Sequence, residues 1–123
     1  MVHQVQRLLA LMQNNLGQEL TLKAMAQYVH VTPEHLCRIF KVQVGCSPAK
    51  YLKRLRLQRA KFLLETSCLS VKEIMVIVGV KDESHFVRDF ALTYAQTPAR
   101  YRELFLVCSR QVDNASLTSR TAN

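Results

Sequence analysis

Residues 20–55 have the sequence LTLKAMAQYVHVTPEHLCRIFKVQVGCSPAKYLKRL, and residues 69–104 repeat its pattern as LSVKEIMVIVGVKDESHFVRDFALTYAQTPARYREL. Four residues recur 49 positions later, namely Leu20, Lys23, Val29 and Val31. After a one-residue insertion, six more recur 50 positions later, namely His35, Arg38, Phe40, Pro48, Ala49 and Tyr51. Identities that hold their spacing over this distance indicate an internal repeat rather than two unrelated pairs of amphipathic helices.

Each copy begins with the signals of a short helix that ends in a tight turn. Thr21 and Ser70 are placed as helix N-caps, and Ser70 with Glu73 matches a capping box. Apolar residues then recur at helical spacing, namely Leu22, Met25, Ala26 and Val29 in the first copy and Val71, Ile74, Met75 and Val78 in the second. The turn falls at His30 and at Gly79. Glycine adopts the left-handed backbone freely, and histidine is among the better-tolerated substitutes.

A second helix follows the turn in each copy and has one apolar and one polar face. Thr32-Pro33 supplies an N-cap and a proline at the first helical position, and Gly45 is placed to end this helix. The apolar face contains Leu36, Ile39 and Phe40 in the first copy and Phe86 and Phe90 in the second. Ser47-Pro48 and Thr97-Pro98 each begin a further helix. Two helices, a tight turn and a polar outward face on the second helix indicate a helix-turn-helix unit, present twice.

Further elements surround the two units. An apolar stripe predicts an opening helix that ends near Gly17, and its residues are Val5, Leu8, Leu9, Met12 and Leu16. We expect a short closing helix from Pro98 to about Val107 and, because its composition is polar, a disordered tail. The resulting division is 1–46 for the opening helix and the first unit, 47–66 for a linker helix, 67–107 for the second unit and the closing helix, and 108–123 for the tail.

The linker helix has two apolar arcs, which predicts burial on two sides between two subdomains. One arc contains Tyr51, Leu52, Leu55, Phe62 and Leu63, and the other contains Leu57, Ala60 and Leu64. Lys50, Arg54 and Lys61 share a third face that is left for solvent or phosphate. Arg56 and Arg59 lie close to the apolar arcs, so we expect them to form internal salt bridges.

Composition favours an all-α fold and a polyanionic partner. The chain has only three Gly and three Pro, and its formal net charge is +8. Residues 19–64 hold nine basic against two acidic residues, net +7, whereas residues 70–105 hold five of each. The four cysteines lack metal-site spacing, which predicts reduced thiols in a cytoplasmic protein. We expect no membrane span, no cofactor and no metal, and the absence of a phosphate loop or catalytic cluster argues against an enzyme.

The chain resembles the DNA-binding region of the AraC/XylS family of bacterial transcription regulators over about residues 2–105. The motifs that carry the resemblance are HLCRIF with Gly45 and Ser47-Pro48 after it, YLKRLRLQRAKFLL, and SHFVRDF followed by TPARYR. The resemblance implies a two-lobed fold of about seven helices, whose third and sixth helices enter successive major-groove segments of double-stranded DNA. It also implies RNA polymerase as a further partner. Longer relatives carry a sensor or dimerisation domain, and short stand-alone members exist.

The resemblance, carried over by position, implies two sets of contact residues. Base contacts fall on Glu34, Cys37, Arg38, Glu83, Ser84, Val87 and Arg88, and phosphate contacts on Thr32, His35, Lys41, Lys50, Arg54 and His85. The chemistry fits, since arginine binds guanine O6 and N7, glutamate accepts from cytosine N4, and small apolar groups meet the thymine methyl. The alternatives are structural: the arginines can pair with carboxylates, and the two glutamates suit the first turn of a helix electrostatically.

The second copy departs from the family pattern at Met75, Val80, Ala91 and Ala95, where the family has a small residue, Phe, a basic residue and Gly. A left-handed alanine costs about 1–2 kcal/mol, so we expect the helix before Ala95 to end differently. These departures, together with the neutral charge, weaken the case for base reading by the second unit. The alternative function is a helical protein-interaction module that keeps the fold and reads DNA weakly.

Overall fold

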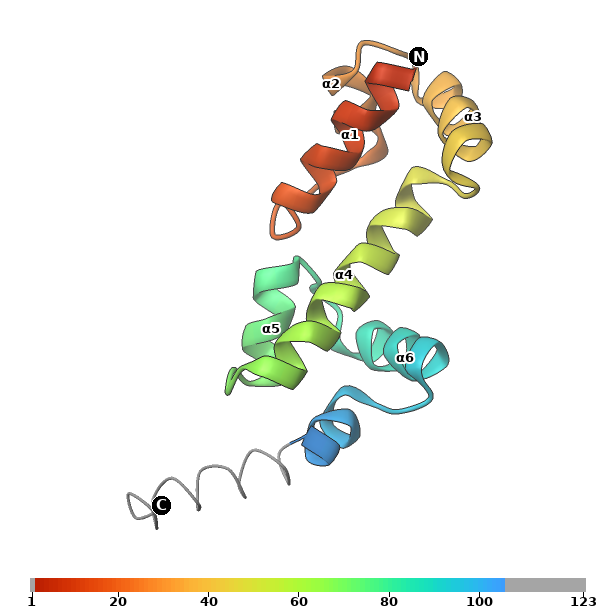
Figure 1. Ribbon diagram of the computed structural model, residues 1–123. Helices are drawn as coiled ribbons and strands as arrows, with labels where there is room; N and C mark the ends of the chain where they lie inside the picture. Colours follow the sequence, from red (N-terminus) through yellow and green to blue (C-terminus); the bar gives the residue numbers. More distant parts are fainter. Residues whose placement is uncertain (1, 106–123) are drawn as a thin grey trace.

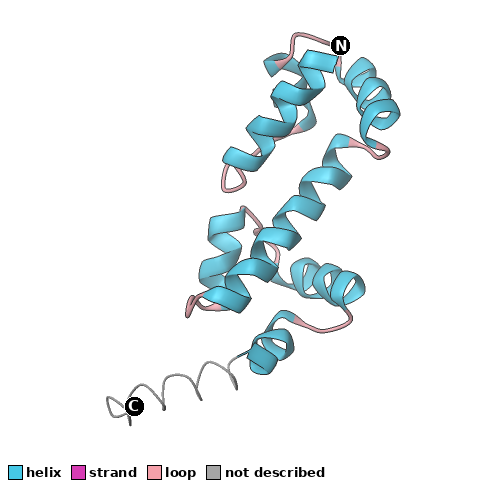
Figure 2. Ribbon diagram, in the orientation of Figure 1, coloured by secondary structure: helices cyan, strands magenta, loops and turns pink. Residues whose placement is uncertain are grey.

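A computed structural model describes residues 2–105, which are mostly helical and contain no strand (Figures 1 and 2). The helices are α1 (Val2–Asn14), α2 (Leu22–Tyr28), α3 (Pro33–Val44), α4 (Pro48–Thr66), α5 (Val71–Val78) and α6 (Glu83–Tyr94), followed by a seventh helix at 98–105. The all-α prediction of about seven helices is confirmed. The predicted end of the closing helix and the tail at 108–123 lie outside the described residues.

Helix starts follow one rule throughout the repeat. A Thr, Ser or Asp side chain at the N-cap accepts a hydrogen bond from the backbone N–H three residues on, and so satisfies a donor that the helix cannot. The N-caps are Thr21, Thr32, Ser47, Ser70, Asp82 and Thr97. The capping box of Ser70 and Glu73 is confirmed, because each residue's side chain accepts from the other's backbone N–H. The helix boundaries are therefore encoded locally.

The turn inside each helix-turn-helix unit has the same geometry in both copies. His30 and Gly79 both adopt the left-handed conformation, with φ of 60° and 80°. The next residue closes each turn by donating its N–H to the carbonyl five residues back, from Val31 to Ala26 O at 3.0 Å and from Val80 to Met75 O at 2.9 Å. This bond is the one that ends many helices before a change of direction. The predicted turns are confirmed.

Two separate hydrophobic cores lie along α4. Figure 1 shows α1, α2 and α3 gathered toward the start of α4, and α5 and α6 toward its end. The first packs α1, α2, α3 and the start of α4 around Val5, Leu8, Met12, Met25, Ala26, Val29, Leu36, Ile39, Phe40 and Leu52. The second packs α5, α6 and the rest of α4 around Leu57, Ala60, Leu64, Ile74, Met75, Val78, Phe86 and Phe90. We call these bodies the first and second lobe, and helix 98–105 belongs to the second. The predicted burial of the linker helix on two sides is therefore observed.

Two residues assigned to the first arc of the linker helix behave differently. Phe62 is 52% exposed, and Leu63 packs with the second core rather than the first. The reason is position along the helix, since each residue adds 1.5 Å and Phe62 lies well past Leu55, the last residue of α4 that packs against the first core. A separate correction concerns α1, which ends at Asn14 rather than near Gly17, because the Asn15 N–H donates to Met12 O, three residues back, instead of continuing the helix.

The end of α6 corrects a further expectation. Ala95 adopts the left-handed conformation, with φ of 66°, and donates its N–H to Ala91 O at 2.8 Å. Gly45 ends α3 in the same way, with φ of 102° and a bond to Lys41 O at 2.9 Å. The prediction that α6 ends differently was wrong, because the same turn must return the chain to the seventh helix whatever residue occupies the position.

The seventh helix is held against the end of α4 by polar contacts. The Tyr101 hydroxyl donates to Glu65, which also pairs with Lys61 at 2.9 Å. The Lys61 ammonium lies 5.7 Å from the centre of the Tyr94 ring. Lys61 was expected to face solvent or phosphate and instead takes part in this cluster, which raises its pKa through hydrogen bonds to Glu65 and Tyr101.

Candidate nucleic-acid interface

Helix α3 is fixed by its inner face and both ends, which leaves its outer face free. Leu36, Ile39 and Phe40 are buried, the Thr32 hydroxyl accepts from His35 N at 3.2 Å, and Gly45 ends the helix. The outer face presents Glu34, Arg38 and Lys41, all exposed, while His35 and Cys37 are half-buried. A helix held in this way presents its polar side chains at fixed positions, as recognition of base edges in a groove requires.

Helix α6 is built alike. Phe86 and Phe90 are buried, and their rings lie 6.0 Å apart centre to centre. Glu83, Ser84 and Arg88 are exposed and Val87 is half-buried. Arg38 and Arg88 thus occupy equivalent exposed positions on the two helices. Within residues 3–105 neither arginine forms an ion pair, whereas Asp89, beside Arg88, pairs with Lys53 of α4 at 3.1 Å.

The start of α6 carries more negative charge than the start of α3. Asp82 caps α6 by accepting from His85 N at 3.0 Å and pairs with His85 Nδ1 at 2.8 Å. These hydrogen bonds, from the backbone first and then the side chain, lower the pKa of Asp82. Glu83 follows directly, whereas α3 begins with the neutral Thr32 and one acid, Glu34. An anion that approaches the helix starts therefore meets less repulsion at α3.

The linker helix places two predicted phosphate contacts in the open. Lys50 and Arg54 are exposed near the start of α4, one helical turn apart, in the half of α4 that packs with the first lobe. Thr32, His35 and Lys41 lie on α3 or its cap, and His85 lies on α6. The structure thus divides the predicted contacts between the two recognition helices and the first half of α4.

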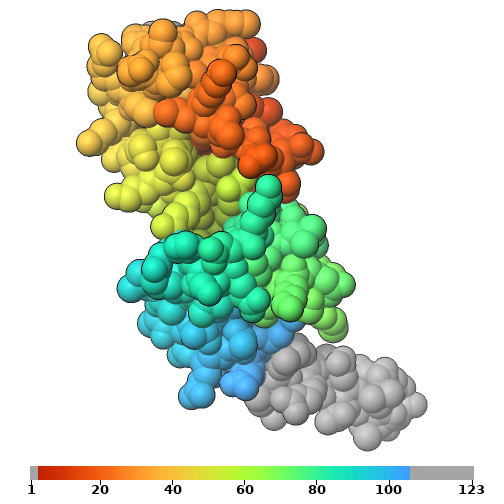
Figure 3. Space-filling model, turned by 180° about the vertical axis from the view of Figure 1, so that it is seen from behind, coloured from red at the N-terminus to blue at the C-terminus, as the bar shows by residue number. Residues whose placement is uncertain are grey.

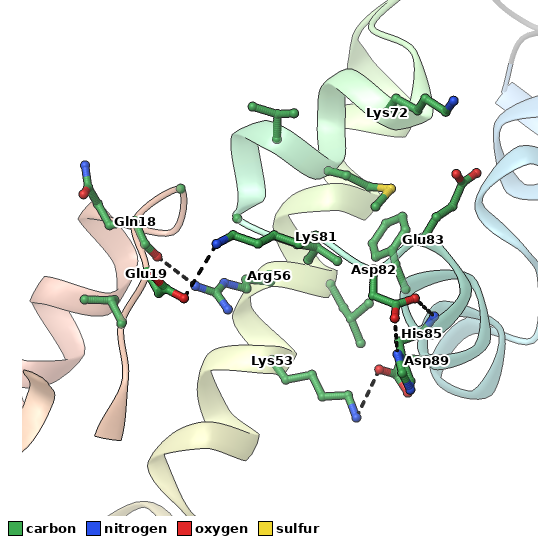
Figure 4. Close-up of a pocket in the computed structure, with 18 of the residues that line it drawn as sticks. Gln18, Glu19, Lys53, Arg56, Lys72, Lys81, Asp82, Glu83, His85 and Asp89 are labelled. Atoms are coloured by element: carbon green, nitrogen blue, oxygen red, sulfur yellow. Dashed lines mark hydrogen bonds and ion pairs between the residues drawn. The ribbon is translucent and has the colours of Figure 1, made fainter. Parts of the chain in front are cut away.

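Arg56 has a different role from the one expected of it. Its guanidinium donates to Leu16 O at 3.3 Å and to Gln18 O at 3.0 Å, and burial lowers its pKa. Arg59 was also expected in a salt bridge, and its guanidinium lies 5.7 Å from the centre of the Phe62 ring. Sequence spacing does not place the partners of Arg56 beside it, whereas Phe62 lies three residues after Arg59 on the same helix. Arg56 borders a cleft of about 890 Å³ between the lobes (Figure 4).

Two findings bear on other kinds of site. Among the residues that the structure describes, no group of three or more His, Cys, Asp or Glu side chains is placed to hold a metal ion. No helix among them is long and apolar enough to span a membrane.

Comparison with known proteins shows which family has this geometry. Residues 25–104 match a family described as a helix-turn-helix domain. An AraC-type DNA-binding-domain regulator from Chromobacterium violaceum has a crystal structure with a TM-score of 0.74 and 31% identity, and the match covers 81% of this chain and 89% of that one. The chain belongs to the AraC-type helix-turn-helix family. Members of the AraC-type family are DNA-binding transcription regulators.

Two more comparisons bear on the AraC-type domain. GbdR, an HTH-type transcriptional regulator of Pseudomonas aeruginosa, is 32% identical over 99 residues, which is 80% of this chain and 27% of GbdR. The DNA-binding domain of AdpA, solved in complex with a target DNA, has a TM-score of 0.81 at 23% identity and supports the fold, with 87% of this chain and 96% of that one covered. The chain spans less than half the length of these curated relatives, from 27% of GbdR to 43% of the bifunctional transcriptional activator/DNA repair enzyme AdaA of Bacillus subtilis.

Proposed function

We propose that this chain binds double-stranded DNA in a sequence-specific manner, with α3 and α6 in successive major-groove segments. The observation that carries the proposal is the repeated construction of the two helices. Each has a buried inner face and a capped start, and each presents an arginine, Arg38 or Arg88, outward at the equivalent position. The major groove is wide enough to admit a helix, and a bidentate arginine is the commonest reader of guanine.

The two recognition helices share a plan of contacts. In α3, Arg38 binds guanine, Glu34 accepts from cytosine N4, and Cys37 meets a thymine methyl. In α6 the same roles fall to Arg88, Glu83 and Val87, and Ser84 contacts either partner of a base pair. The contacts that position the duplex without reading it are Thr32, His35, Lys41, Lys50, Arg54 and His85. Support for this assignment comes from the exposure or partial exposure of every residue named.

The first lobe is the stronger anchor in this proposal. Residues 19–64 carry net +7 whereas residues 70–105 are neutral, and phosphate attraction supplies most of the sequence-independent affinity. Asp82 and Glu83 stand at the start of α6, where they oppose a phosphate. His85 is already paired with Asp82, so its contact with phosphate requires that pair to open.

The test begins with selection of bound sequences from a random DNA library, followed by titration of single-base variants of the selected site. Arg38→Ala should relax the preference at one or two base pairs and weaken specific binding by about 1–3 kcal/mol. Arg88→Ala should do the same, more weakly, at a segment about 10 base pairs away. Circular dichroism checks that both variants fold.

The controls separate the competing interpretations. Equal losses on every base variant would make Arg38 a phosphate contact, and a larger effect at Arg88 would reverse the ranking of the lobes. Titration of the unmodified protein with duplex DNA of random sequence, at several salt concentrations, tests the function itself. The affinity of a DNA-binding protein falls steeply as the salt concentration rises. Binding without salt dependence would favour a helical protein-interaction module.

Further features of the whole protein belong to the same proposal. We propose that the domain regulates transcription in the cytoplasm, contacts RNA polymerase, works together with a sensor or dimerisation domain and has no catalytic role of its own. The support is its family membership and the greater length of the curated relatives.

A further inference from the structure

The two lobes touch directly, beside the linker helix that joins them. Residues 16–19, which follow α1, lie against residues 77–81, at the end of α5 and in the turn after it. Figure 3 shows this contact from behind, where the orange-red surface of the first lobe adjoins the green surface of the second. We call this contact the lobe junction.

Two glycines let the main chains approach closely at the lobe junction. A Cβ atom at Gly79 would clash with the carbonyl oxygen of Leu16, which is backbone and cannot move aside. A Cβ atom at Gly17 would lie 3.0 Å from the carbonyl oxygen of Ile77, again backbone. Glycine at both positions therefore allows the two main chains to lie at a distance that any larger residue would increase. Gly79 also serves the turn of the second unit, whereas Gly17 lies outside both units.

Arg56 joins the linker helix to the same contact (Figure 4). Its Nε donates to Leu16 O at 3.3 Å and its Nη2 to Gln18 O at 3.0 Å, so one planar group holds two carbonyls of a loop about forty residues earlier in the chain. A Cβ at Gly79 would also lie 3.2 Å from Arg56 Nη2, so the guanidinium borders both lobes.

Two ion pairs accompany these contacts. Lys81 and Glu19 join the lobes at 3.6 Å, but their side chains are 83% and 75% exposed, so water and salt screen this pair. Lys53, in the part of α4 that packs with the first lobe, pairs with Asp89 of α6 at 3.1 Å and so also joins the lobes, but its side chain is 55% exposed and this pair is screened as well. The backbone contacts at Gly17 and Gly79 and the Arg56 hydrogen bonds are therefore the stronger restraint on how the lobes are oriented.

We propose that the lobe junction, through Arg56, Gly17 and Gly79, holds α3 and α6 at one separation and angle and so selects the spacing of the two DNA segments that they enter. The inference rests on the proposed DNA binding. The lobes have separate cores that divide on α4 between Leu55 and Leu57, where a pivot would change the angle between the recognition helices. Two linked modules bind together only when their geometry matches both sites.

Two variants and one matched control test this inference. Arg56→Met keeps much of the apolar stem and removes both hydrogen bonds to the loop. Arg59→Met removes the same charge from the same helix, three residues on, without touching the lobe junction. Gly17→Ala leaves the charge unchanged and adds a methyl group against Ile77 O, which pushes the lobes apart by a few tenths of an ångström.

The first readout is binding to duplexes in which the distance between the two selected segments is changed by one or two base pairs. A one-base-pair change should weaken the unmodified protein and Arg59→Met by about tenfold or more, but Arg56→Met by about threefold or less. Gly17→Ala should shift or flatten the preference. A variant that loses affinity equally at every spacing would overturn the inference, as would equal flattening by Arg59→Met.

The second readout does not depend on DNA. Val42 and Leu92 occupy equivalent, exposed positions on α3 and α6, so spin labels at Val42→Cys and Leu92→Cys report the distance between the recognition helices once the native cysteines are replaced. The distance distribution should be narrow in the unmodified background and broad with Arg56→Met. An unchanged distribution would overturn the lobe junction's role even where the protein binds DNA. If Arg56→Met broadens the distance distribution as expected but the protein binds no duplex, the result would instead count against the proposed function alone.

Discussion

Replacement of Ala95 by glycine should stabilise the protein. Ala95 ends α6 with φ of 66°, a conformation that costs an L-residue about 1–2 kcal/mol. Glycine removes this cost but loses more backbone entropy on folding, by about 0.5–1 kcal/mol. The expected gain in the free energy of unfolding is therefore about 0.5–1 kcal/mol, or about 2–5 °C in Tm for a domain of this size. Urea denaturation followed by circular dichroism measures it.

Gly45 provides the matched control because it ends α3 in the same conformation. A Cβ atom there would meet nothing within 4 Å, so Gly45→Ala tests the backbone cost without a clash. It should lower the free energy of unfolding by about 0.5–1 kcal/mol, opposite in sign to Ala95→Gly. Changes of the same sign in the two variants would refute this account of the helix ends. DNA affinity should stay unchanged in Ala95→Gly, since Ala95 lies outside the proposed contacts.

Two further predictions concern charge. The double variant Lys50→Gln with Arg54→Gln should lower DNA affinity uniformly across sequences. It should also flatten the slope of log K against log salt concentration by roughly 1–2 units, because each phosphate that is no longer neutralised removes about 0.9. An unaltered slope would show that this face of α4 is only solvated. The hydrogen bond from the Ser70 backbone is the main cause of the lowered pKa of Glu73 in the folded protein. The stabilisation that Glu73 contributes is therefore fully present above its unfolded pKa of about 4.3, and it is lost as the pH falls through the lower pKa of the folded state. Glu73→Gln should therefore narrow the difference in unfolding free energy between pH 7 and pH 3, and an equal difference in both proteins would contradict the assignment.

Several features of this protein follow from the sequence alone because they depend on residues three to five positions apart. The side chains of Thr32 and Ser70 cap helices by reaching N–H groups three residues on, and Gly79 turns the chain through its own φ. The repeat then doubles the unit, and helical periodicity selects the buried faces. The outward position of Arg38 follows as well, since the opposite face of its helix must be buried.

Tertiary structure decided the features that depend on residues far apart. Helical spacing places Arg56 near an apolar arc, yet its partners are carbonyls at residues 16 and 18, which no local pattern places beside it. Phe62 has the helical angle of a buried residue but lies beyond the first lobe, so it remains exposed. Ala95 takes a costly conformation because the return to the seventh helix requires it. Local interactions set where helices begin and end, whereas the relation between the lobes arises only when the folded backbone brings distant carbonyls, glycines and one guanidinium together.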